Sequence, residues 1–95
     1  MKLLPKQVRL LKQCLKKSDE NVQLYLFGSR IDDTRPGGEI DLLIITRKLK
    51  RTNLWMLRQP FYEQFGEQKI DIVLTNPDKP QSAFVQHILP QALEL

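Results

Sequence analysis

The sequence predicts a small α/β (α+β) protein, with a mixed β-sheet of three or more strands and helices on one face. Its apolar residues first recur at helical spacing and then alternate within short segments that are separated by further helical stretches. The first two strand segments are joined by only about ten residues, which favours antiparallel or mixed pairing over a parallel crossover. A chain of 95 residues can build one modest core. We therefore expect residues 1–95 to form a single domain.

Residues 5–17 are expected to form an amphipathic helix. Its apolar stripe recurs at helical spacing and consists of Leu4, Val8, Leu11 and Leu15. Pro5 suits the first turn of a helix, where its missing N–H group is not needed. The basic residues lie mainly off this stripe and include Lys2, Lys6, Arg9, Lys12 and Lys16. We interpret them as a solvated face in preference to a nucleic-acid-binding surface, because no aromatic residue lies among them.

Three segments have the composition and alternation of β-strands, and they span residues 22–27, 39–46 and 69–74. In the second segment, Glu39 and Asp41 face one side of the sheet while the intervening isoleucine faces the other. Residues 42–45 are apolar on both faces. That part of the strand is therefore expected to be covered on both sides or to be central in the sheet.

Two further helices are expected, one after the second strand and one after the third. Residues 52–65 carry apolar side chains at helical spacing; Pro60 should kink or split this helix, and Gly66 is suited to end it. Residues 81–94 are expected to form the last helix, with Phe84 and Ile88, and Ala92 as a further candidate, facing the core and with Pro90 marking a late kink or break.

The composition argues against membrane-spanning, secreted and disulfide-stabilised proteins. A net charge of +4 with 41% hydrophobic residues is ordinary for a soluble globular chain. No apolar run is long enough to span a membrane, and the first residues lack the apolar stretch of a secretory signal. Cys14 is the only cysteine, which excludes an internal disulfide and a thiolate metal cluster. We therefore expect a cytoplasmic protein without a membrane partner.

Three acidic residues lie inside strand segments, where acids are depleted. Glu39 and Asp41 are two residues apart on one strand, so their carboxylates point to the same face. Asp71 joins them if the third strand is adjacent to the second, because neighbouring strands are about 4.8 Å apart. Converging carboxylates need a counter-ion, and Mg²⁺ combines a few carboxylates with water and phosphate oxygens. Glu39, Asp41 and Asp71 are thus the candidate metal ligands and catalytic residues.

A Gly-Ser turn directly follows the first strand. Gly28 lets the backbone turn sharply and approach a ligand closely. Ser29 can cap a helical turn whose free N–H groups attract phosphate, and Arg30 adds positive charge for a polyphosphate. We expect these three residues to bind the phosphates of a nucleotide. Asp71 would then deprotonate or orient an attacking hydroxyl in a two-metal nucleotidyl transfer that releases pyrophosphate.

Each feature alone also has an ordinary structural explanation. Most Gly-Ser pairs are simple turns, exposed strand faces often carry acids, and Asp71 could pair with Lys69 or Arg47. His87, the only histidine, lies far in sequence from the acids and is interpreted as a structural residue. The combination of turn and acids, in this order and on one expected face, is what favours a metal and nucleotide site.

This combination resembles the nucleotidyltransferases of the DNA polymerase beta superfamily. The matching segments are residues 28–30, 39–42 and 70–72, and the resemblance extends over about residues 22–74. In size the chain is similar to the minimal nucleotidyltransferases (MNT), which contain little more than this domain. The resemblance implies a nucleotidyltransferase fold, ATP or another NTP as donor, and Mg²⁺ as cofactor. The family usually has aspartate at the first acidic position, where this chain has Glu39.

The resemblance also implies a protein partner. Minimal nucleotidyltransferases are commonly paired with a small helical HEPN protein, an RNase-type toxin, and some transfer AMP from ATP to a tyrosine of that toxin. The leading hypothesis is therefore a toxin-antitoxin enzyme that modifies a hydroxyl of its partner. The alternative is a catalytically degenerate antitoxin that acts by complex formation, because the longer Glu39 side chain alters a geometry that Mg²⁺ tolerates poorly. A third hypothesis is a nucleic-acid binder that uses the basic first helix.

Overall fold

The computed structural model describes residues 3–28 and 39–95 of the chain. In chain order, its elements are α1 (Pro5–Lys16), β1 (Gln23–Phe27), β2 (Ile40–Ile45), the 3-10 helix η2 (Arg51–Asn53), α2 (Trp55–Phe65), β3 (Ile70–Thr75), α3 (Ala83–Ile88), the 3-10 helix η3 (Leu89–Gln91) and β4 (Leu93–Glu94). None of the helices in these two ranges has the length and apolar character needed to cross a membrane.

The sheet is mixed, as the sequence predicts. Its four strands lie in the order β3-β2-β1-β4. β1 runs antiparallel to both β2 and β4, whereas β2 and β3 run parallel. The parallel connection from β2 to β3 passes through α2, and the antiparallel step from β1 to β2 is the short one that the sequence indicated. The central position of β2 explains why its apolar residues are buried on both faces.

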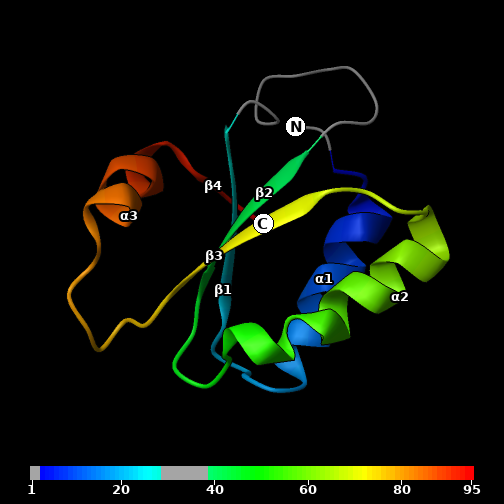
Figure 1. Ribbon diagram of the computed structural model, residues 1–95, viewed down its shortest axis with the longest axis horizontal. Coiled ribbons are helices and arrows are strands. Elements are labelled where there is room, and N and C mark those ends of the chain that lie inside the picture. Colours follow the sequence, from blue (N-terminus) through cyan, green and yellow to red (C-terminus); the bar gives the residue numbers. More distant parts are fainter. Residues whose placement is uncertain (1–2, 29–38) are drawn as a thin grey trace.

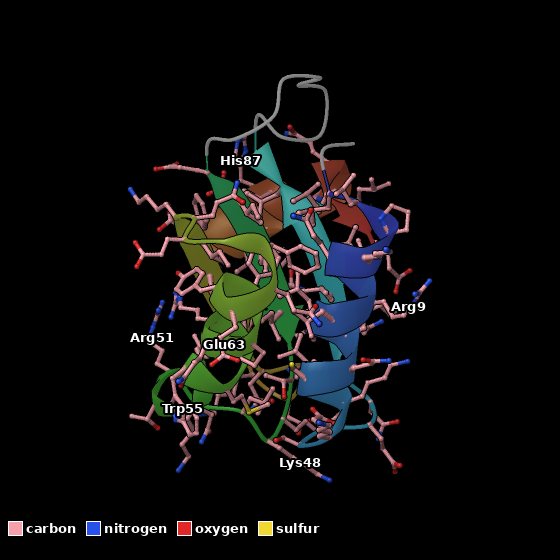
Figure 2. The ribbon with its side chains drawn as sticks, turned by 90° about the vertical axis from the view of Figure 1, so that its right-hand side faces the viewer. Arg9, Lys48, Arg51, Trp55, Glu63 and His87 are labelled. Atoms are coloured by element: carbon pink, nitrogen blue, oxygen red, sulfur yellow. The ribbon has the colours of Figure 1, made fainter. Side chains whose placement is uncertain are left out.

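α1 and α2 cover one face of the sheet and lie side by side (Figures 1 and 2). Alternate strand residues such as Leu26, Leu42 and Ile72 pack against Leu15 of α1 and Phe61 of α2 in the main core. α2 is not split at Pro60, because Leu57 and Phe61 on either side of the proline are both fully buried and anchor the helix to the core. Gly66 ends α2 with φ of +86°, as expected.

The opposite face is covered by α3 (Figure 1). Val85 and Ile88 pack against Leu43 of β2 in a second, smaller core. The sequence predicted helices on one face of the sheet. In the structure α1 and α2 lie on one face, whereas α3 lies on the other. The two-sided burial of β2 requires a cover on each side, and α3 supplies the second one.

The predicted final helix over residues 81–94 is too long. α3 ends at Ile88, Pro90 lies within η3, and Leu93 and Glu94 then pair with β1 as the edge strand β4. A proline cannot donate the hydrogen bond that would continue an α-helix, so the chain turns there and reaches the sheet edge.

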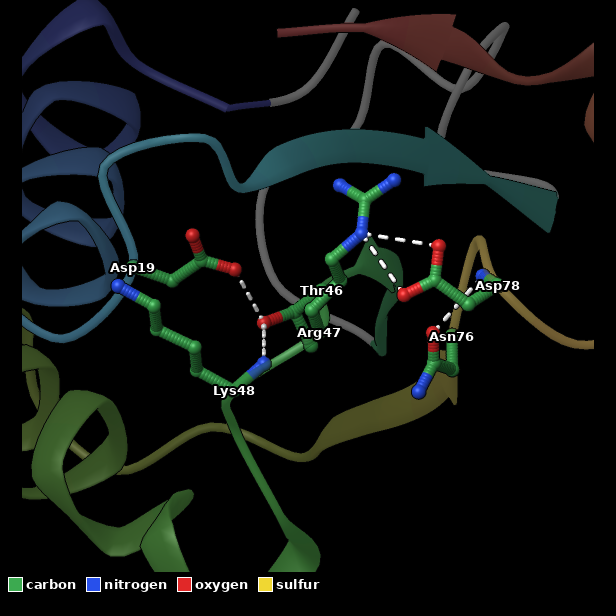
Figure 3. Close-up of polar contacts among 6 residues, drawn as sticks. All are labelled: Asp19, Thr46, Arg47, Lys48, Asn76 and Asp78. Atoms are coloured by element: carbon green, nitrogen blue, oxygen red, sulfur yellow. Dashed lines mark hydrogen bonds and ion pairs between the residues drawn. The ribbon is translucent and has the colours of Figure 1, made fainter.

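A buried polar contact ties the end of α1 to the end of β2 (Figure 3). Asp19 is 4% exposed, and its Oδ2 accepts a hydrogen bond of 2.6 Å from Thr46 Oγ1. Thr46 Oγ1 in turn accepts from the N–H groups of Lys48 and Leu49, at 3.2 Å each. The hydrogen bond from Thr46 is the main reason that the pKa of Asp19 is lowered. This contact fixes the chain where it leaves the central strand.

Candidate functional site

The three acidic residues meet at one end of the neighbouring strands β2 and β3. Asp41 and Asp71 are direct partners in the parallel pairing of β2 with β3. Glu39 lies two residues before Asp41, immediately before β2 begins. Each of the three carboxylates offers one oxygen, and these oxygens all lie within 4.8 Å of one another. The structure therefore brings together the acids that the sequence placed on one expected face.

Gly28 is in contact with this cluster. It follows β1, whose last residue Phe27 pairs with Asp41 across the antiparallel ladder. Its φ of +82° is in the region that favours glycine. A Cβ atom at this position would lie 2.5 Å from Oδ2 of Asp41, which is closer than real Cβ atoms come. Glycine is thus needed here both for its backbone conformation and to leave room for the Asp41 carboxylate.

Lys69 supplies a positive charge to the cluster. Its Nζ lies 2.7 Å from Oε1 of Glu39 and 4.0 Å from Oδ2 of Asp71. From the sequence, Lys69 is expected only as an ordinary ion-pair partner of Asp71. In the structure its closer partner is Glu39. Its spacing of two residues before Asp71 was the available signal, because it places both side chains on the same face of β3.

Asp41 is the most buried of the three carboxylates. Its pKa is raised above the usual aspartate value, first by burial and then by the negative charges of Glu39 and Asp71, with a partial offset from Lys69. The pKa of Lys69 is raised as well, chiefly by its hydrogen bond to Glu39. Asp41 is the inner carboxylate, and the side chains of Glu39 and Asp71 are about half exposed, at 49% and 50%. A ligand can therefore reach the cluster from solvent.

A family model described as "Polymerase beta, Nucleotidyltransferase" matches residues 10–94. The chain belongs to this nucleotidyltransferase family. Among curated proteins, no significant match was found. The match runs from within α1 to β4 and includes every residue of the acidic cluster. An acidic cluster able to bind a metal ion is typical of this nucleotidyltransferase family, and here it consists of Glu39, Asp41 and Asp71.

The carboxylates of the acidic cluster fit a divalent cation. Two oxygens that bind one Mg²⁺ at its usual distance lie at most about 4.2 Å apart. Separations of up to 4.8 Å are close enough for small side-chain rotations to close them around one ion, or to hold two ions about 3.5–4 Å apart. All the donors are carboxylate oxygens, the ligand type that Mg²⁺ prefers over nitrogen or sulfur.

Three other residues were considered for the site from the sequence, namely Ser29, Arg30 and Arg47. Ser29 and Arg30 lie outside the described residues, so their expected contacts with phosphate stay predictions. Arg47, the other candidate partner of Asp71, instead binds Asp78 with Nε 2.9 Å from Oδ2 (Figure 3). That pair follows the far ends of β2 and β3, so it leaves Asp71 to the acidic cluster.

Proposed function

We propose that this nucleotidyltransferase transfers a nucleoside monophosphate, expected to be AMP from ATP, to a hydroxyl group of an acceptor. The observation that carries the proposal is the convergence of three carboxylates within 4.8 Å in a chain that belongs to the family. The cluster lies at a half-exposed end of the sheet, which gives both donor and acceptor access to it.

Glu39, Asp41 and Asp71 would hold Mg²⁺. Bound there, the metal supplies positive charge for the phosphate oxygens of the donor and the leaving group. Gly28 begins the turn that, with Ser29 and Arg30, is proposed to bind the phosphates. The position of Gly28 against Asp41 supports this, because it places the start of that turn beside the carboxylates.

The proposed reaction is an in-line displacement at the α-phosphorus. The acceptor oxygen forms a new bond to that phosphorus while the bond to the pyrophosphate oxygen breaks, and pyrophosphate leaves. Asp71 is proposed to accept the hydroxyl proton or to orient the hydroxyl. Its exposed carboxylate, at the edge strand of the sheet, supports this role because a macromolecular acceptor can approach it.

For the acceptor, we propose a separate protein of the HEPN type, with this chain acting as its antitoxin in the cytoplasm. The support is the resemblance of the motif to that of minimal nucleotidyltransferases. Nucleic acid is a less favoured acceptor, since the basic residues of α1 lie among no aromatic side chains.

The proposal is tested by label transfer. The protein is mixed with Mg²⁺, ATP labelled on the α-phosphate, and a lysate of the source cell. We expect one labelled macromolecule, whose mass identifies the acceptor, and we expect the label to disappear with Asp41→Asn or Asp71→Asn. Asp78→Asn is the matched control, because it removes an exposed carboxylate at the far end of the sheet. Full transfer by either of the first two variants would refute the proposed role of the cluster.

One observation favours the alternative, a degenerate nucleotidyltransferase that acts by complex formation. The ammonium group of Lys69 already lies 2.7 Å from Glu39, so this carboxylate has a counter-ion without any metal. In that case Asp41→Asn would still bind and neutralise the partner. Measurable binding of Mg²⁺–ATP without any label transfer would support this alternative.

A further inference from the structure

An aromatic pair lies on the same face of the sheet as the carboxylates. Phe27 is the cross-strand partner of Asp41, and directly paired residues project to the same face. The ring of Phe84 in α3 packs edge-on against Phe27, with ring centroids 6.0 Å apart and an interplanar angle of 77°. Phe84 therefore packs directly against the strand residue that pairs with Asp41, on the face of the sheet that carries the acidic cluster.

Phe84 is exposed although its helix is firmly held. The side chain is 52% exposed, whereas the neighbouring Val85 is 2% and Ile88 is 8% exposed. The two buried residues fix α3 against Leu43 of the central strand, and Ser82 caps the helix by accepting a hydrogen bond from the N–H group of Val85. The exposed ring thus has a defined position next to the site.

We propose that Phe84, supported by Phe27, is the stacking platform for the base of the donor nucleotide. This inference rests on the proposed function, because it requires the triphosphate to lie at Glu39, Asp41 and Asp71. A nucleotide held there by its phosphates must place its base somewhere along the same face. In the described part of the chain, Phe84 is the large apolar side chain that is both exposed and packed against the strand residue paired with Asp41.

The chemistry of the platform has a consequence for specificity. Stacking on an aromatic ring tolerates any base, because every base has a π-face. Phe84 has no hydrogen-bonding group with which to read the base edge. This subsite therefore favours a large flat ring and discriminates weakly between adenine and guanine.

The test is calorimetric titration of the whole protein with Mg²⁺–ATP and, separately, with magnesium tripolyphosphate, which has no base. Phe84→Ala is expected to weaken Mg²⁺–ATP binding by about 5- to 150-fold, the effect of losing one base–aromatic stack. Binding of tripolyphosphate should stay unchanged. Phe84→Leu keeps an apolar side chain against Phe27 and should also weaken ATP binding. A loss of ATP binding in both variants would therefore not be explained by misfolding of the alanine variant. Mg²⁺–GTP should bind the wild-type protein about as well as Mg²⁺–ATP.

Trp55→Ala is the matched control. Trp55 is also an exposed aromatic residue, at 65%, but it belongs to α2 on the other face of the sheet (Figure 2). It should leave ATP binding unchanged. Wild-type affinity for Mg²⁺–ATP in both Phe84 variants would overturn the inference while the proposed function stands. An equal loss of tripolyphosphate binding would also overturn it, since the effect would then be structural. Absence of any nucleotide binding or transfer by the wild-type protein would refute the proposed function and this inference with it.

Discussion

Gly28→Ala tests whether the glycine exists to leave room for Asp41. The new Cβ would lie 2.5 Å from Oδ2, whereas real Cβ atoms keep at least 3.0 Å, so the oxygen must retreat by 0.5 Å or more. The carboxylate can rotate away at little cost to folding, but it then leaves its place near Glu39 and Asp71. A misplacement of 1 Å can lower a reaction rate about 100-fold. We therefore expect label transfer to fall by about tenfold or more, together with weaker Mg²⁺ binding in calorimetric titration.

Gly66→Ala is the matched control for this variant. Gly66 has nearly the same backbone angle, with φ of +86° against +82°, but an added Cβ would meet nothing within 4 Å. Both variants should lose about 1–3 kcal/mol of unfolding free energy, the cost of placing an L side chain at a backbone position with positive φ, as measured by urea denaturation. Only Gly28→Ala should lose Mg²⁺ binding. Equal Mg²⁺ affinity in the two variants would refute the argument that the glycine shapes the metal site.

Three further predictions follow from the polar contacts. Asp41→Asn should raise the unfolding free energy of the metal-free protein at neutral pH, as measured by urea denaturation, because the folded state raises the pKa of Asp41 and so disfavours its charged form. The same variant should abolish Mg²⁺ binding in calorimetric titration. Thr46→Val should cost about 1–3 kcal/mol in urea denaturation, because the buried Asp19 carboxylate loses the hydrogen bond from Thr46 at Oδ2 and keeps only bonds from backbone N–H groups such as that of Asn21 at Oδ1. Lys69→Met should strengthen binding of Mg²⁺ alone by about 1.4- to 5-fold, the scale of an exposed ion pair.

The Thr46 and Lys69 predictions each have a matched control. Thr46→Ser keeps the hydroxyl and should retain most of the stability lost in the valine variant. The pKa of Asp19 is lowered in the fold, so its contribution to stability is present above the unfolded pKa and is lost as pH falls through the folded pKa. A valine variant that lost as much stability on acidification as the wild type would contradict this account. Lys79→Met, in the turn that follows β3, is the charge control for Lys69→Met.

Much of the fold could be predicted because its signals are local. Alternation of apolar residues located β1, β2 and β3 to within about one residue at each end, and the short connection indicated the antiparallel pair. β4 could not be found in this way, since two residues carry no period and Leu93 and Glu94 become a strand only by pairing with Leu26 and Tyr25. The inward face of α3 was also misjudged: Phe84 was expected in the core, but Val85 occupies it. A helix of six residues has fewer than two turns, so the spacing of its apolar residues does not show which of these two side chains faces the core.

The geometry of the site could not be predicted from the sequence, because it depends on the register in which β2 and β3 pair. The sequence contains two similar segments, Glu39-Ile-Asp41 and Lys69-Ile-Asp71, and either could have been displaced along the other. The parallel register pairs Asp41 with Asp71, which sets Glu39 and Lys69 side by side two residues earlier. This one alignment both assembles the three carboxylates and places the ammonium group of Lys69 beside Glu39 and Asp71.

Lys69 therefore bears directly on whether Glu39 supports catalysis. The carboxylate of Glu39 contacts Lys69 at 2.7 Å, and a metal at this cluster must compete with that ammonium group. If Lys69→Met strengthens Mg²⁺ binding and preserves transfer, the lysine is a replaceable counter-ion of the cluster, as expected if Glu39 is free to bind the metal. If the same variant leaves Mg²⁺ binding unchanged, Glu39 takes no part in holding the metal. The site then rests on Asp41 and Asp71 alone, and the glutamate belongs to a salt bridge instead of an active centre.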